Sequence, residues 1–240
     1  MDLGLAGKHA LVCGGSEGIG RAAAIELAQL GADVTLLARR EDALRDAVTA
    51  LPCSGNQQHG CVIADVAHTV ALSQTAAALV AQRPVHILVN NSGGPPGGAA
   101  HAADIAAYLD AFNKHLIANH ALLQTVLPGM RAARWGRIVN VISTSVKEPI
   151  ANLGVSNTIR GAVASWAKTL SRELGCDGIT VNNVLPGYTR TQRLDQILAD
   201  RSAATGKTPD EVATTMLASV PRACRAAPPA PSRGWQSGAC

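Results

Sequence analysis

The sequence predicts a doubly wound α/β fold, in which helices cover both faces of a six-stranded parallel sheet. Short apolar runs rich in β-branched residues alternate with longer amphipathic or alanine-rich stretches, as in βαβ units. A glycine-rich segment directly follows the first apolar run. The 240 residues are 47% hydrophobic and only 2% aromatic, and a chain of this length can bury one sizeable core. We therefore expect a single domain over residues 1–220.

The expected strands and helices alternate along the chain. The strands are predicted at residues 9–13, 33–38, 60–64, 86–90, 137–142 and 179–184. The helices are predicted near residues 22–31, 41–50, 69–82, 103–133 and 156–174. In doubly wound folds, ligands bind beyond the carboxyl ends of the strands. Functional residues are therefore expected directly after each strand.

After the first strand, glycines recur with the spacing G-x-x-x-G-x-G where a strand gives way to a helix. Glycines lack a Cβ and let the backbone approach a phosphate, while a helix N-terminus offers unpaired N–H groups and partial positive charge. A turn of this kind can also be plain packing. The candidate pyrophosphate-binding residues are Gly14, Gly15, Ser16, Glu17, Gly18, Ile19 and Gly20.

Polar or turn-forming residues also follow the other five strands, as the fold class requires of a ligand site. In strand order they are Arg39, Asp65, Asn91-Ser92-Gly93, Ser143 and Pro186-Gly187.

Composition disfavours several other classes of protein. The six cysteines form no C-x-x-C pair and the seven histidines are scattered, so neither a disulfide framework nor a metal site is expected. Three of the four net positive charges come from Arg222, Arg225 and Arg233, so the basic balance does not indicate nucleic acid. The N-terminus lacks a signal-peptide pattern, and no apolar run approaches the roughly 20 residues of a membrane helix. We expect a cytoplasmic protein with neither nucleic acid nor membrane as partner.

From about Leu5 to about Thr191, the chain resembles the short-chain dehydrogenase/reductases and is similar to the 3-oxoacyl-carrier-protein reductases among them. Residues 14–20 match the family's T-G-x-x-x-G-x-G, with Cys13 in the threonine place. Residues 90–93 read N-N-S-G against the family's N-N-A-G, and residues 186–189 match the P-G loop that meets the nicotinamide carboxamide. The resemblance implies a Rossmann-like domain, which has seven strands in the family, and hydride transfer with a dinucleotide.

The resemblance also assigns dinucleotide contacts beyond the glycine-rich segment. Asp65 is expected to accept from the adenine amino group, although it could instead be the N-cap of the following helix. The further cofactor-binding residues that the resemblance implies are Val66, Asn91, Gly93, Pro186, Gly187 and Thr189.

Arg39 decides the expected choice of cofactor. An acid after the second strand would bind the ribose 2′-hydroxyl, whereas the planar guanidinium of Arg39 suits a 2′-phosphate. We predict NADP and leave NAD open, because Glu17 stands where many NADP-preferring relatives carry a base. A solvated loop arginine is the alternative interpretation of Arg39.

The catalytic positions are where the chain departs from the family. The family has a serine, a tyrosine thirteen residues later and a lysine four further on, and these places hold Ser143, Ser156 and Arg160. A serine hydroxyl is a far weaker acid than a phenol, so a water would have to span the gap to a substrate carbonyl. Arg160 keeps a positive charge but does not readily release a proton. His115 replaces the asparagine of the family's proton relay and is either a new proton donor or a polar helix residue.

Two functions follow from these residues. The chain is expected to be an NADP-dependent oxidoreductase of a small carbonyl or alcohol substrate, with slow turnover, or else a non-catalytic dinucleotide-binding sensor or partner. Residues 191–217 read as a helical substrate lid interrupted by a Pro-bounded turn at 205–209. Residues 221–240 read as an atypical Pro/Arg-rich tail, in which we expect no counterpart of the family's seventh strand. We therefore expect a homodimer through helices 103–133 and 156–174 rather than a tetramer built on the sixth strand.

Overall fold

The computed structural model describes residues 3–218 of the chain. The chain divides into two compact units after Pro186, and each is described by itself. The predicted domain boundary at residue 220 and the tail at 221–240 lie outside the described residues.

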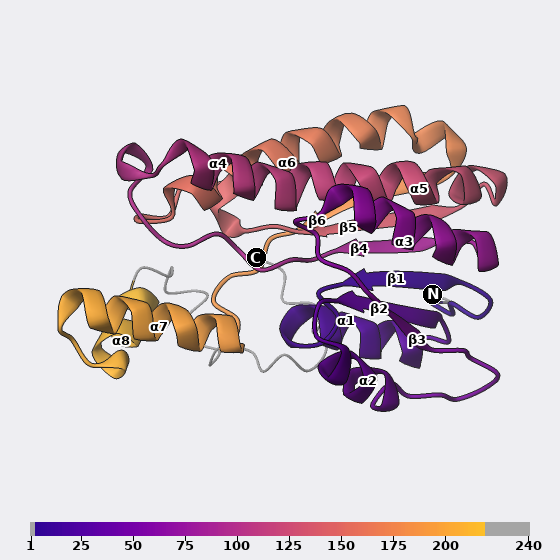
Figure 1. Ribbon diagram of the computed structural model, residues 1–240, viewed down its shortest axis with the longest axis horizontal. Helices are drawn as coiled ribbons and strands as arrows, with labels where there is room; N and C mark the ends of the chain where they lie inside the picture. Colours follow the sequence, from indigo (N-terminus) through magenta and orange to yellow (C-terminus); the bar gives the residue numbers. More distant parts are fainter. Residues whose placement is uncertain (1–2, 219–240) are drawn as a thin grey trace. The chain divides into compact units, whose positions relative to one another are not determined.

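The first unit is built on one parallel sheet with the strand order β3-β2-β1-β4-β5-β6 (Figure 1). From the central pair of β1 and β4, successive strands are added outward on both sides of the sheet. This arrangement confirms the predicted doubly wound, Rossmann-like fold. The strands are β1 (His9–Cys13), β2 (Asp33–Ala38), β3 (Gly60–Ile63), β4 (Ile87–Asn90), β5 (Gly136–Val141) and β6 (Ile179–Val184).

Helices cover both faces of this sheet. Alternate residues of β1 point to opposite faces, so Ala10 and Val12 pack in the core with α1 and α2, while Leu11 and Cys13 pack in the core with α3, α5 and α6. The α-helices are α1 (Gly18–Gln29), α2 (Glu41–Thr49), α3 (Thr69–Gln82), α4 (Ile105–Phe112), α5 (Ala118–Ala132) and α6 (Gly154–Glu173), and the 3-10 turns are η1 (Ala100–Ala102), η3 (Thr144–Val146) and η4 (Gly175–Asp177).

Two helix predictions were wrong in detail. The first helix begins at Gly18, not at residue 22, because the last glycines of the turn form its first residues. The single helix predicted over 103–133 is two α-helices joined by the π-helical turn η2 (Asn113–Ile117). A π-turn holds an additional residue within a helix and is often found at functional sites, and the hydrophobic pattern did not reveal it.

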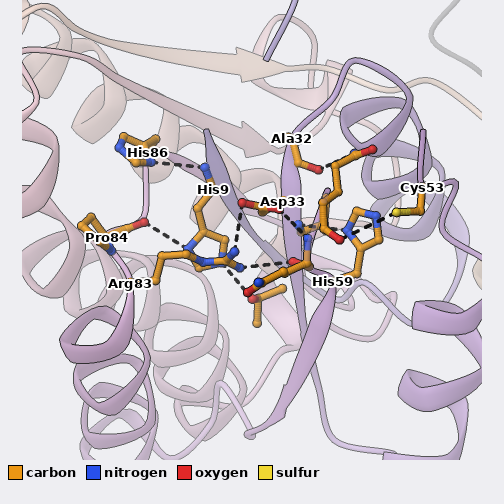
Figure 2. A network of polar contacts seen from close by, with 12 residues as sticks. His9, Ala32, Asp33, Cys53, His59, Arg83, Pro84 and His86 are labelled. Carbon is orange, nitrogen blue, oxygen red and sulfur yellow. Dashed lines mark hydrogen bonds and ion pairs between the residues drawn. The ribbon is translucent and has the colours of Figure 1, made fainter. Parts of the chain in front are cut away.

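A buried polar network lies at the amino ends of β1 and β2 (Figure 2). The imidazole of His9 lies 2.8 Å from the Thr35 hydroxyl and 3.0 Å from the Pro84 carbonyl oxygen. Beside it, Arg83 and Asp33 form an ion pair of 2.9 Å. Burial lowers the pKa of His9 to about 4. The amino ends of the strands lie opposite the carboxyl ends, where ligands bind in this fold class. We therefore assign this network a role in stabilising the fold.

The second unit contains α7 (Gln192–Thr205) and α8 (Pro209–Ala218). Gly206, with φ of +68°, ends α7. Thr208 and Glu211 form a capping box at the start of α8, since Glu211 accepts the Thr208 N–H at 2.8 Å and donates its own N–H to the Thr208 hydroxyl at 3.3 Å. The interrupted helical segment predicted at 191–217 is therefore confirmed, while its role as a lid remains a prediction.

Candidate active site

The turn between β1 and α1 is open to an anion. Glu17, the N-cap residue, makes no side-chain cap bond, and no acidic residue lies in the first turn of α1. Within the described residues, no side chain therefore occupies the N–H groups of Gly18, Ile19 and Gly20. Unpaired N–H groups and the helix dipole at such a turn favour a phosphate.

The glycines of this turn are also required by packing. A Cβ on Gly14 would lie 2.6 Å from the Asn91 side-chain nitrogen, and a Cβ on Gly20 would overlap the Gly14 carbonyl oxygen. A Cβ on Gly15 would lie 2.8 Å from Leu36. The packing interpretation of the motif therefore holds for these three glycines, and anion binding remains a prediction.

Asn91 connects the end of β4 to the same turn. Its Nδ2 donates to the carbonyl oxygens of Cys13 and Gly14, at 3.4 and 3.3 Å. The structure thus brings a residue predicted from the N-N-S-G motif against the glycine-rich segment. These bonds fix the gap between the carboxyl ends of β1 and β4, the point where the strand order reverses.

Two arginines follow β2 and differ in their partners. Arg39 is 76% exposed and lies 3.9 Å from Asp65, an exposed contact that contributes little. Arg40, which was not among the predicted site residues, pairs with Glu17 at 2.7 Å. Glu17 is therefore charge-compensated, which weakens the sequence argument that its carboxylate opposes a 2′-phosphate.

Asp65 shapes the turn before α3. Its Oδ1 accepts the Ala67 N–H at 2.9 Å, but the N-cap of α3 is His68. The alternative interpretation of Asp65 as the N-cap is therefore wrong, because the helix begins three residues later than that role requires. Its neighbour Val66 packs against the core.

Ser143 lies at the carboxyl end of β5, where it begins η3. Its Oγ accepts the Ser145 N–H at 3.1 Å, which leaves the hydroxyl proton of Ser143 available to donate. The hydroxyl of Ser145 is buried and has no hydrogen-bond partner among the described residues.

Ser156 and Arg160 lie one turn apart on α6. Ser156 is partly exposed in the first turn of the helix. Arg160 is only 8% exposed and donates from Nη1 to the Val141 carbonyl oxygen at 2.9 Å, at the end of β5. The guanidinium of Arg160 is therefore held at the end of β5, the strand that Ser143 follows.

His115 and Ser92 form a contact that sequence analysis missed. The π-helical turn η2 places His115 in the interior, 2% exposed, with Nδ1 2.8 Å from the Ser92 hydroxyl. Burial, together with the nearby positive charges of Arg160 and Lys114, lowers the pKa of His115 to about 3. The ring is neutral near pH 7, so it holds no imidazolium proton to deliver. Ser92 replaces the alanine of the family's N-N-A-G motif, and this replacement is the sequence feature that could have indicated the contact.

The predicted P-G loop spans the division between the two units. Pro186 ends the first unit, and Gly187 and Thr189 belong to the second. Within the second unit, the Thr189 hydroxyl donates to the Gly187 carbonyl oxygen at 3.4 Å. Gly93, by contrast, lies in the first unit and is exposed.

Residues 8–202 match the family model described as short chain dehydrogenase. The chain belongs to the short-chain dehydrogenase family. The match spans the glycine-rich turn, the segment after β4 and all of α6, so the predicted family is confirmed. In residues 3–218, no three His, Cys, Asp or Glu side chains gather as a metal site would require, and no helix has the length and apolar character to cross a bilayer.

The chain is similar to several ketoreductases. It is 36% identical over 192 residues to ketoacyl reductase 1, named for the granaticin polyketide synthase of Streptomyces violaceoruber, covering 78% of this chain and 70% of that one. It is 33% identical over 215 residues to a 3-oxoacyl-acyl-carrier-protein reductase of Pseudomonas aeruginosa, covering 86% and 84%. Among solved structures, L-sorbose reductase of Gluconobacter frateurii, complexed with NADPH and L-sorbose, gives a TM-score of 0.79 at 26% identity and 90% coverage of both chains.

Proposed function

We propose that this chain is an NADP-dependent oxidoreductase that interconverts a small carbonyl compound and its alcohol. The observation that carries the proposal is the first turn of α1, where the N-cap residue makes no side-chain hydrogen bond. This turn follows the glycine-rich segment at the point where the strand order of the sheet reverses. The family membership and the ketoreductases among its relatives support the reaction class.

The residues after β1 and β2 fit NADP. Gly18, Ile19 and Gly20 would hold the pyrophosphate, and Arg39 would hold the 2′-phosphate through its exposed guanidinium. Asp65 remains the candidate for the adenine amino group, and Asn91 remains a further candidate for cofactor binding. The chemistry that NADPH supplies when bound is a hydride for the carbonyl carbon.

Ser143 and Arg160 would act on the substrate oxygen. Because Ser143 Oγ already accepts the Ser145 N–H, its own proton is directed to a second acceptor, and a carbonyl oxygen is such an acceptor. The buried charge of Arg160 near the end of β5 would stabilise negative charge that develops on that oxygen.

The proton for the reduced product would come from water. Ser156 has an aliphatic hydroxyl, His115 is neutral, and Arg160 does not release its proton at neutral pH. A water held between the serines would have to deliver the proton, so turnover would be slow.

A non-catalytic dinucleotide-binding protein is the second candidate. The observation that favours it is the hydrogen bond from Arg160 to the Val141 carbonyl oxygen, which ties the guanidinium to the fold. In that case the cofactor would bind as a signal or as part of a complex, and no carbonyl compound would be reduced.

A titration with NADPH and NADH, followed by nicotinamide fluorescence, tests cofactor binding separately from turnover. Tighter binding of NADPH than of NADH, lost in Arg39→Ala and retained in the exposed α6 variant Arg172→Ala, is the expected result. A ketone panel then separates the two candidates, since only the oxidoreductase consumes NADPH. If neither cofactor binds to folded protein, both candidates fail.

We also propose that the protein is a cytoplasmic homodimer rather than a tetramer. Ile105, Leu109 and Phe112 lie at helical spacing on α4 and are 80, 65 and 38% exposed. Apolar side chains in such a row mark an interaction face. Light scattering after size-exclusion chromatography tests the dimer, and Leu109→Glu should convert it to monomer.

A further inference from the structure

The outer edge of β6 has unpaired backbone groups. Strand β6 ends the sheet order, and the Gly178 and Val184 carbonyl oxygens accept N–H groups from the β5 side. In a strand, the backbone groups of alternate residues point to opposite sides. The N–H and C=O groups of Val181 and Asn183 therefore point away from β5, and neither has a backbone partner within residues 3–218.

A groove of about 530 Å³ lies along this edge. Residues 178–183 form one wall, and Ala167, Lys168 and Ser171 of α6 form the other. Thr180 and Asn182 are exposed, and no proline or charged residue in β6 blocks the approach of another strand. Such an edge is a template for strand addition.

The charge of the groove selects among possible occupants. Among residues 3–218, the charged residues that line it are Lys168 and Arg137, and both are basic. Arg137 is fixed by a bond to the Gly178 carbonyl oxygen at 3.2 Å and by Trp135, whose ring centre lies 4.2 Å from the guanidinium carbon. Lys168 forms no ion pair in the described part of the chain.

The same charge disfavours two occupants. A second copy paired edge to edge would bring two basic grooves together. Residues 219–240 contain three arginines and no acid, so this segment also lacks complementary charge. An acidic segment of another protein has both the backbone groups and the charge that the edge requires.

We propose that the β6 edge binds an extended acidic segment of a partner protein by β-strand addition. The backbone groups of Val181 and Asn183 would pair with the incoming strand, and Lys168 and Arg137 would pair with its carboxylates. This surface lies on the edge strand and uses no residue assigned to cofactor or substrate.

The test is fluorescence polarisation of the full chain with a labelled seven-residue peptide of alternating valine and glutamate. We expect saturable binding, weakened about tenfold or more by Lys168→Glu, which reverses one charge of the contact. The matched control Arg172→Glu, on the exposed part of α6, should bind as the unchanged protein does. A peptide N-methylated at alternate amides should not bind, because it cannot complete the strand pairing.

Three outcomes would overturn the proposal. Equal binding of the N-methylated peptide would mean attraction by charge alone. No binding to protein that is folded by circular dichroism would remove the site. A dimer in light scattering that dissociates in Asn183→Pro, which removes an outward N–H group of the edge, would mean that a second copy occupies the edge.

Discussion

The Oγ of Ser92 lies 2.8 Å from Nδ1 of His115. These are two of the positions at which the chain departs from the family's sequence pattern, and the fold places them in contact. Ser92 follows β4, and His115 lies in the π-helical turn between α4 and α5. Because burial keeps the imidazole neutral, the pair is a hydrogen bond between neutral groups that ties η2 to the sheet.

We expect Ser92→Ala to destabilise the protein by about 1–3 kcal/mol, since it leaves a buried imidazole nitrogen without its partner. Urea unfolding followed by circular dichroism measures the change. The control is Ser165→Ala, an exposed serine on α6, which should stay within about 0.5 kcal/mol of the unchanged protein. Equal stabilities of the two variants would show that the contact contributes nothing.

The double substitution Ser156→Tyr with Arg160→Lys should raise ketone reduction by about a hundredfold or more, because a phenol beside an ammonium group restores general acid catalysis. NADPH consumption at 340 nm measures the rate. Arg160→Lys alone is the control, and it should give little gain. If the double variant binds NADPH but gains no rate, the proposed reductase chemistry at Ser143 is wrong.

Arg40→Ala should lower NADPH affinity several-fold while changing NADH affinity less. The substitution removes the partner of Glu17, and an uncompensated carboxylate then repels the 2′-phosphate. Adding Glu17→Gln should restore the affinity. Failure of this rescue would show that the Arg40–Glu17 pair has no part in cofactor choice.

Stability should fall as the pH drops below about 6.5. Burial lowers the pKa of His9 to about 4 and that of His115 to about 3, so the unfolded chain takes up protons before the folded one does. Between pH 7 and 5, the loss is expected to be roughly 2 kcal/mol for each histidine. Urea unfolding at both pH values measures it, and His115→Asn should make the dependence shallower. The matched control is His101→Asn, which replaces an exposed histidine.

Two glycines in helices should respond in opposite ways to alanine. Gly20→Ala places a Cβ against the Gly14 carbonyl oxygen, whereas a Cβ at Gly161 would meet nothing within 4 Å. We expect Gly20→Ala to destabilise by at least about 2 kcal/mol and to weaken NADPH binding. Gly161→Ala should stabilise by about 0.5–1 kcal/mol through helix propensity. Destabilisation by both would mean that α6 requires Gly161 for another reason.

Strand positions followed closely from the sequence, whereas the interior of the site did not. The strands at 9–13, 33–38 and 179–184 were predicted to the residue. The first two are buried along most of their length and read as nearly continuous apolar runs, whereas the third begins with alternating buried and exposed residues. The π-helical turn at η2 leaves no comparable pattern, since one additional residue barely shifts the hydrophobic period. His115 and Ser92 could therefore each be named from the sequence, but their contact could not.

The sequence by itself determined the order of strands and helices, the glycine-rich turn and the absence of the family's tyrosine and lysine, because local backbone preferences and residue identity decide these features. Only the tertiary structure decided which charges meet and which are buried. Arg40 lies against Glu17, Arg160 lies against the Val141 carbonyl oxygen, and His115 loses its proton through burial. These properties depend on desolvation and on distances between segments far apart in the chain, so no local pattern of residues could have specified them.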